Sequence, residues 1–124
     1  MGKYLITKTK SGFHFVLKAN NNQVIGTSEV YTSKAACLNG IKSINTYAGK
    51  APLEDNTLLK PVPQKKPKFE IFYDKAKEYR FRLIAPNGEN ILASEGYKSK
   101  DSCKKGIASV RKNSKSKVVE AEEE

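Results

Sequence analysis

The sequence predicts an α+β fold made of two tandem copies of one β-β-β-α-β unit. Three observations support this prediction. Residues 13–44 align with residues 79–110 at a constant offset of 66 positions, and 14 of the 32 aligned pairs are identical. In each copy, apolar residues alternate with other residues along one segment, which is the period of a half-buried strand. A later segment carries apolar residues at three- and four-residue spacing, which is the period of a helix.

Each copy begins with two predicted strands. The first is expected at Tyr4–Lys8 and again at Phe69–Tyr73, and the second at Phe13–Ala19 and again at Tyr79–Ala85. In the second strand, aromatic and aliphatic side chains occupy every other position and therefore share one face. This alternation is typical of an antiparallel strand that buries one face against a core.

A tight turn and a third strand follow. In the second copy the turn is Pro86-Asn87-Gly88-Glu89, and Asn-Gly favours the positive φ angles of a type I′ turn. The first copy has Asn20-Asn21-Asn22 in this place, which tolerates the same geometry. The third strands are expected at Gln23–Ser28 and Glu89–Ser94.

A helix comes next in each copy, with Ser33 and Ser99 as predicted N-caps, because a serine hydroxyl accepts a hydrogen bond from the first turn. The apolar stripe of each helix is expected to face the sheet, and its glycine lets the two approach closely. The stripe residues are Cys37, Gly40, Ile41 and Ile44 in the first copy and Cys103, Gly106, Ile107 and Val110 in the second. Short final strands are expected at Asn56–Leu59 and Lys117–Glu120.

The chain divides into four segments. A first copy occupies residues 1–60, a Pro-rich linker residues 61–67, a second copy residues 68–120 and an acidic tail residues 121–124. One copy of about 50 residues buries too little surface to be stable alone. We therefore expect the two copies to pack about a pseudo-twofold axis in one compact, monomeric unit.

The strings VIGTSEVYTSKAACLNGIKSI and ILASEGYKSKDSCKKGIASVRKN resemble the YegP-like family of small bacterial proteins of unassigned function. The resemblance spans both copies, at residues 3–50 and 68–115. This chain departs from the family pattern at Val30 and at the Asn20–Asn22 turn. The resemblance implies one antiparallel sheet in which the units exchange their last strands, so that Asn56–Leu59 joins the second unit and Lys117–Glu120 joins the first. It brings no catalytic residues.

Composition excludes several classes of protein. The chain of 124 residues carries 23 Lys and Arg against 13 Asp and Glu, a net charge of +10. No segment approaches the roughly 20 apolar residues that a membrane helix needs, and the first residues lack the apolar core of a signal peptide. Two cysteines in a chain of this length favour reduced thiols. We therefore expect a cytoplasmic protein without a membrane partner.

The sequence offers no group of catalytic residues, and we expect no enzyme activity, no cofactor and no metal site. His14 is the single histidine and lies on the polar face of a predicted strand, where a role at the sheet surface is expected. Cys37 and Cys103 fall on the core stripes of the helices, where thiols pack as small apolar groups. One histidine and two cysteines do not make a four-ligand zinc site, and neither glycine-rich phosphate motif is present.

Two equivalent corners carry the most prominent polar identities, Ser28-Glu29-Val30-Tyr31 and Ser94-Glu95-Gly96-Tyr97. The structural interpretation is a strand-to-helix corner in which the glutamate lies near the helix N-terminus, the tyrosine packs on the sheet and the serine caps. The functional alternative is a small-molecule site at this corner.

Basic residues interleaved with aromatic ones are the main functional signal. Arg80 and Arg82 share the strand face opposite the aromatic core side, and Phe72 or a tyrosine is available for stacking. If that face is uncovered, it forms a cationic strip that tracks phosphates. The candidate nucleic-acid contacts are Arg80, Arg82, Lys104, Lys105, Arg111 and Lys112.

Together these features favour a non-enzymatic interaction or structural protein. Non-specific binding of nucleic acid through a basic sheet face is the first alternative, because a net charge of +10 attracts polyanions even without a recognised motif. Small-molecule binding at the Ser-Glu-x-Tyr corner is the second. The partner stays open at this point, with nucleic acid and an acidic protein as the candidates.

Overall fold

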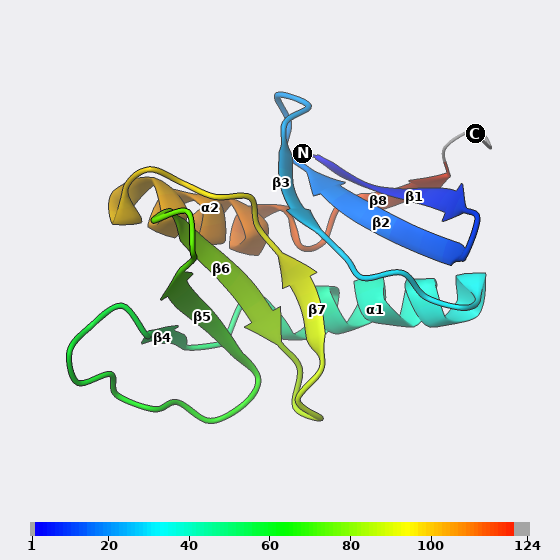
Figure 1. The fold of residues 1–124 in the computed structure, drawn as a ribbon. Helices are drawn as coiled ribbons and strands as arrows, with labels where there is room; N and C mark the ends of the chain where they lie inside the picture. Colours follow the sequence, from blue (N-terminus) through cyan, green and yellow to red (C-terminus); the bar gives the residue numbers. More distant parts are fainter. Residues whose placement is uncertain (1, 121–124) are drawn as a thin grey trace.

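The computed structural model describes residues 2–120 and confirms the predicted α+β fold (Figure 1). The acidic tail at residues 121–124 lies outside the described residues. The strands of the first repeat and its helix are β1 (Lys3–Thr9), β2 (Gly12–Lys18), β3 (Val24–Thr27), α1 (Lys34–Tyr47) and β4 (Leu53–Asp55). Those of the second are β5 (Lys68–Tyr73), β6 (Tyr79–Ile84), β7 (Asn90–Ala93), α2 (Lys100–Asn113) and β8 (Lys117–Glu120).

All eight strands form one sheet, in the order β4-β5-β6-β7-β3-β2-β1-β8. Read from its two ends, the sheet has equivalent strands at equivalent places. Strand β4 at one end corresponds to β8 at the other, followed inward by β5 and β1, β6 and β2, and β7 and β3. At the centre Thr27 pairs with Ala93, its own equivalent at the offset of 66. A pseudo-twofold axis therefore passes between β3 and β7. It divides the sheet into an N-terminal half-sheet (β3, β2, β1, β8) and a C-terminal half-sheet (β7, β6, β5, β4).

The two repeats exchange their last strands, as the family resemblance implied. Strand β4 of the first repeat pairs with β5, and β8 of the second repeat pairs with β1. Both of these pairings are parallel, so the sheet is mixed, although the other ladders are antiparallel. Strand β4 ends at Asp55, earlier than the predicted Asn56–Leu59, because Asp55 Oδ1 accepts hydrogen bonds from both the N–H and the hydroxyl of Thr57 and closes a turn.

The hairpin turns differ from the predicted type I′ geometry. Gly88 N–H donates to the Ala85 carbonyl at 2.9 Å, and only Gly88 has a positive φ, of 88°. The loop is therefore a three-residue connection that begins as a type I turn and ends in one left-handed residue. Asn22 is that residue in the first repeat, with a φ of 71°. Proline fits at position 86 because the second residue of such a turn keeps a negative φ.

The helices begin at the predicted caps, because Ser33 Oγ accepts a hydrogen bond from Ala36 N–H and Ser99 Oγ accepts one from Ser102 N–H, each at 3.1 Å. Every residue predicted for the two apolar stripes is buried. A Cβ added at Gly40 would overlap the Tyr31 hydroxyl. The glycine is therefore required by the close approach of helix and tyrosine, as the stripe pattern indicated.

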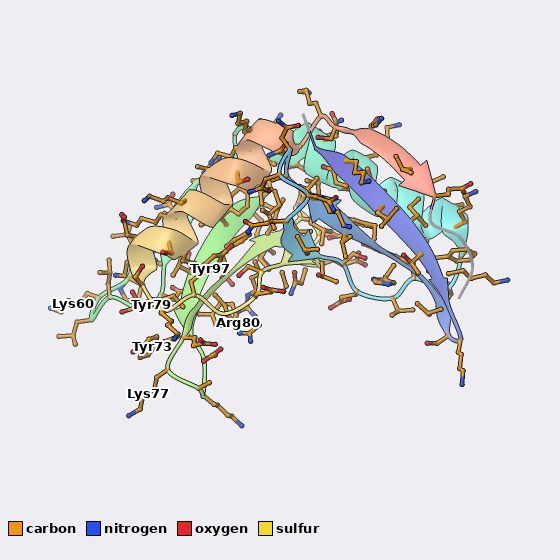
Figure 2. The ribbon with its side chains drawn as sticks, turned by 90° about the horizontal axis from the view of Figure 1, so that it is seen from above. Lys60, Tyr73, Lys77, Tyr79, Arg80 and Tyr97 are labelled. Carbon is orange, nitrogen blue, oxygen red and sulfur yellow. The ribbon has the colours of Figure 1, made fainter. Side chains whose placement is uncertain are left out.

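Each helix packs on its own half-sheet, but the twist of the sheet puts the two helices on opposite sides of the molecule. Figure 1 shows α1 below β1 and β2, and α2 above β5 and β6. We call the uncovered face of each half-sheet its open face. The open face of the N-terminal half-sheet and the exposed side of α2 therefore lie on the same side of the protein, which is the side that Figure 2 shows nearest the viewer. No helix within residues 2–120 is long and apolar enough to cross a membrane.

Candidate nucleic-acid interface

The six basic residues singled out in the sequence do not form one surface. Arg80 and Arg82 lie on the open face of the C-terminal half-sheet, on the side of the molecule opposite α2. Lys104, Lys105 and Lys112 are exposed on α2. The sixth residue, at position 111, is half-buried between the repeats.

Arg80 and Arg82 lie on an uncovered face, which was the condition for the predicted cationic strip, but each arginine is paired with a carboxylate. Arg80 Nε donates to Asp74 Oδ2 at 2.6 Å, and this hydrogen bond is the largest cause of the lowered pKa of Asp74. Arg82 Nε donates to Glu70 Oε1 at 2.7 Å. Each arginine therefore has a carboxylate within ion-pair distance, which lowers the net positive charge of this face.

Arg111 stabilises the joint between the repeats. Its Nη1 donates to the Ala48 carbonyl at 2.9 Å, at the C-terminus of α1, and its guanidinium lies 4.8 Å from the centroid of the Phe69 ring. In the other half the equivalent carbonyl, of Ser114, accepts a hydrogen bond from the Tyr4 hydroxyl at 2.7 Å. Phe69 is the equivalent of Tyr4 and has no hydroxyl, so Arg111 supplies the missing donor. Burial lowers the pKa of Arg111.

A row of three lysines crosses the open face of the N-terminal half-sheet. In the strand registers Lys3 pairs with Lys18 on β2 and with Lys117 on β8. Register partners point to the same side of a sheet and are about 5 Å apart, and the next residue of β1, Tyr4, faces the core. Within residues 2–120 none of the three lysines has an acidic partner.

The same position in the second repeat is neutralised. Lys68 is the equivalent of Lys3, and its Nζ lies 3.0 Å from Glu54 Oε1 and 3.3 Å from Glu70 Oε2. The pKa of Glu54 is lowered to about 2, mainly because its carboxylate accepts a hydrogen bond from the Gln64 N–H and, second in size, one from Lys68. This carboxylate therefore stays ionised.

Apolar residues replace both carboxylates in the N-terminal half-sheet. Leu5 stands at the position equivalent to Glu70, and Val119 at the position equivalent to Glu54. Lys3 therefore lacks the two carboxylates that neutralise its equivalent, Lys68.

The lysine row continues onto α2. A groove of about 540 Å³ separates the loop after β2 from the C-terminal part of α2, and Asn20, Asn21, Ser109 and Lys112 are among its lining residues. Lys105 is one helical turn from Ser109 and makes only a 3.8 Å contact with Asp101, where both side chains are more than 80% exposed. Such a pair contributes little. We define the cationic face as Lys3, Lys18, Lys104, Lys105, Lys112 and Lys117.

Sequence reasoning found the α2 half of this face and missed Lys3, Lys18 and Lys117. Counting charges does not show which lysine has an acid opposite it, because that depends on strand register. The signal was nevertheless present in two parts. Alternation placed Lys18 on the outer face of a strand, and the implied exchange of last strands placed Lys117 beside the first strand.

The Ser-Glu-x-Tyr corners hold each second strand to the chain that enters the helix. Ser28 Oγ accepts a hydrogen bond from Phe15 N–H and donates to the Glu29 carbonyl, both at 2.8 Å. Tyr31 exchanges two backbone hydrogen bonds with Phe13, and its ring stacks on that of Phe15 at 6.3 Å. The second repeat repeats all of these contacts. The serine therefore binds the strand, and the helix cap is the later serine.

The remaining candidate residues have structural surroundings. His14 is half-buried on the open face of β2. Cys37 and Cys103 are buried free thiols, and burial raises the pKa of Cys103 to about 11, so that it is protonated at neutral pH. Within residues 2–120 no three His, Cys, Asp or Glu side chains gather to hold a metal ion.

Comparison with known proteins places both repeats in one family. The family model described as "Domain of unknown function (DUF1508)" matches this chain twice, at residues 9–55 and 74–120. The UPF0339 protein YegP of Yersinia pestis is 38% identical over 120 residues, which cover 96% of this chain and 94% of that protein. The solution structures of yegP from E. coli and of UPF0339 protein SO3888 from Shewanella oneidensis align with TM-scores of 0.77 and 0.79. Each is 31% identical to this chain and covers 96% of it, and the chain covers 91% and 90% of them. The chain therefore belongs to the UPF0339 family of YegP-like proteins and carries the DUF1508 domain twice.

Proposed function

We propose that this protein is a non-enzymatic binding protein, that its partner is a nucleic acid, and that the cationic face contacts the phosphate backbone. The observation that carries the proposal is the row Lys117, Lys3 and Lys18, which lie side by side on neighbouring strands without acidic partners within residues 2–120. Like charges directly opposite one another destabilise a sheet. The negative phosphates of a polyanion offset that repulsion, and each phosphate contact also releases condensed counterions from the nucleic acid.

An acidic protein is the other partner class, and the form of the surface favours nucleic acid. The lysines extend from the edge strand β8 across β1 and β2 and along α2, so they present charge over a long track. A phosphate backbone matches such a track because its charges recur at regular intervals along one direction. Backbone contacts of this kind carry no sequence information, which predicts binding without strong sequence preference.

A cavity at the first Ser-Glu-x-Tyr corner supports small-molecule binding as a second candidate. Its volume is about 610 Å³, and Glu29, Tyr31, Asn39, Glu89 and Asn90 are among its lining residues. Of the residues between 2 and 120, two carboxylates and no Lys or Arg line it, so it does not suit a phosphate. A thermal-shift screen of small amines tests this candidate function. If no amine raises the Tm of the protein, small-molecule binding at this corner is rejected.

Fluorescence anisotropy with a labelled mixed-sequence oligonucleotide tests the main proposal at about 50 and 200 mM salt. If six lysines contact phosphates, affinity falls on the order of 10³-fold across this range for a duplex and about 300-fold for a single strand. In the variant Lys3→Ala/Lys18→Ala/Lys117→Ala the fall is expected to be about 40-fold for a duplex and about 20-fold for a single strand, because three contacts remain. The matched control, Lys42→Ala/Lys65→Ala/Lys66→Ala, removes three exposed lysines outside the cationic face and should keep the wild-type salt dependence.

Two results would overturn the proposal. The first is an affinity for every oligonucleotide weaker than about 10⁻⁴ M at 50 mM salt, which is the range of weak non-specific binding. The second is an equal loss of affinity in the two triple variants, because net charge alone would then explain the binding.

A further inference from the structure

We infer, on the basis of the proposed function, that the nucleic acid is single-stranded and that Tyr73 is a stacking platform for one of its bases. Tyr73 is 53% exposed, and the centroid of its ring lies 4.7 Å from that of Tyr79, with the planes tilted by 47°. An aromatic ring of this kind, held in place on one side and open on the other, is what a base without a paired partner stacks on.

The tyrosine pair is supported from the core. Tyr73 and Tyr79 pair across β5 and β6, on the face that α2 covers further along the strands. Tyr79 exchanges backbone hydrogen bonds of 2.8 and 2.7 Å with Tyr97, whose ring in turn stacks on Phe81. Figure 2 shows the three tyrosines gathered at one end of the molecule, beyond the start of α2. The exposed ring is therefore held against Tyr79, whose backbone is fixed to that of Tyr97, and it needs little ordering when it binds.

Neither the first repeat nor the neighbouring residue offers such a platform. Lys8 and Phe13 occupy the positions equivalent to Tyr73 and Tyr79, so the exposed tyrosine belongs to the second repeat alone. Phe72 lies one residue away on the opposite face, and the Arg82 guanidinium stands 4.7 Å from the centroid of its ring. That contact occupies a face of Phe72, the ring that the sequence offered for stacking.

The charges near Tyr73 allow a phosphate backbone to approach. Lys60 and Lys77 are exposed at the same end of the molecule as Tyr73 (Figure 2) and have no ion-pair partner within residues 2–120. Two of the acids in this region are already paired. Asp74 binds Arg80, and Asp55 binds Lys100 with an oxygen-to-nitrogen distance of 2.9 Å.

The platform and the cationic face are on the same side of the protein. In Figure 2 the tyrosines lie at one end of α2, and the open face of the N-terminal half-sheet lies beyond its other end. The 14 residues of α2 span about 20 Å, a distance that a short single strand can follow. One strand can therefore contact the lysines along α2 and stack a base on Tyr73. A duplex keeps its bases paired and stacked inside and offers none to this ring.

The absence of tryptophan from the chain permits a direct test. The full-length variant Tyr73→Trp places a single fluorescent indole at the platform, and Phe72→Trp is the matched control on the opposite face of the same strand. Each variant is titrated with a 12-nucleotide oligothymidylate, a duplex of the same length and inorganic polyphosphate, while anisotropy follows binding. We expect the single strand to quench the indole of Tyr73→Trp and to leave that of Phe72→Trp unchanged.

The variant Tyr73→Leu provides a second measurement that keeps the apolar contact with Tyr79. Loss of one stacked base should weaken single-strand binding roughly 5- to 100-fold, with no change for polyphosphate. If single strand and duplex bind alike and neither quenches Tyr73→Trp, the platform is refuted while the proposed function stands. If no anion binds wild type or any variant, the proposed function fails as well.

Discussion

Lys100 Nζ lies 2.9 Å from Asp55 Oδ2, and this ion pair ties the first residue of α2 to the last residue of β4. Strand β4 comes from the first repeat and α2 from the second, so the contact holds an exchanged strand to the half-sheet that receives it. Lys34 and Glu120 occupy the equivalent positions and form the equivalent ion pair, between α1 and β8. The two repeats therefore share the same ion pair, one at each end of the sheet.

The two equivalent ion pairs should contribute unequally to the free energy of unfolding. Lys100 and Asp55 have side chains that are 30% and 15% exposed, whereas those of Lys34 and Glu120 are 48% and 57% exposed. We expect Asp55→Asn to lower the free energy of unfolding by about 1–2 kcal/mol and Glu120→Gln to lower it by less than about 0.5 kcal/mol. Urea unfolding followed by circular dichroism measures both. Equal effects of the two substitutions would contradict the role of burial.

The carboxylate network of the C-terminal half-sheet should make stability dependent on acid pH. The pKa of Glu54 falls from its usual 4.5 to about 2 in the folded protein, first through the Gln64 N–H and then through Lys68. Between these two values the unfolded chain binds more protons than the folded one, so stability is present at neutral pH and is lost as pH falls from about 4.5 towards 2. Asp55 and Asp74 also have lowered pKa values and act in the same direction.

Comparison of wild type with Glu54→Gln tests this dependence. We expect the urea midpoint of wild type to fall over that pH interval, and the variant to be less stable at neutral pH but to change less on acidification. If the two curves stay parallel, Glu54 is not a source of the pH dependence.

Arg111→Ala and Lys112→Ala remove the same charge from neighbouring positions and should have different effects. Arg111 binds the end of α1 and covers the Phe69 ring, so its loss is expected to lower stability by about 1–2 kcal/mol. Its loss should leave affinity for an oligonucleotide nearly unchanged. Lys112→Ala should leave stability nearly unchanged and reduce the slope of log affinity against log salt by about 1. If Arg111→Ala instead weakened oligonucleotide binding and left stability unchanged, Arg111 would belong to the nucleic-acid interface.

Gly40→Ala should be destabilising because the added Cβ overlaps the Tyr31 hydroxyl. Overpacking of this kind costs about 1–3 kcal/mol. The double variant Gly40→Ala/Tyr31→Phe removes the hydroxyl and should recover part of the loss, which a double-mutant cycle measures as a coupling energy. Gly49→Ala is the matched control, because a Cβ there meets nothing within 4 Å. Additive effects at positions 40 and 31 would show that the contact is relieved in another way.

The sequence by itself determined the duplication, the order of elements, both helix caps and both core stripes. These features rest on local signals, because a cap depends on residues three positions apart and a stripe on a fixed helical period. The family resemblance added the exchange of last strands, which periodicity alone does not contain. The same local signals mislocated β4 and assigned the wrong turn to the hairpins, because the chain closes a turn at Asp55 and left-handed geometry is needed at one hairpin residue only.

Only the tertiary structure decided which charges are free. Arg80 and Lys3 look alike as basic residues on the polar face of a strand, yet one binds Asp74 and the other has two lysines as its neighbours across the sheet. The difference comes from strand register and from the exchanged strand β8, which brings Lys117 beside a residue 114 positions away in the chain. Cross-strand pairing is a long-range property, and the energy of a surface charge depends on the partner that this pairing supplies.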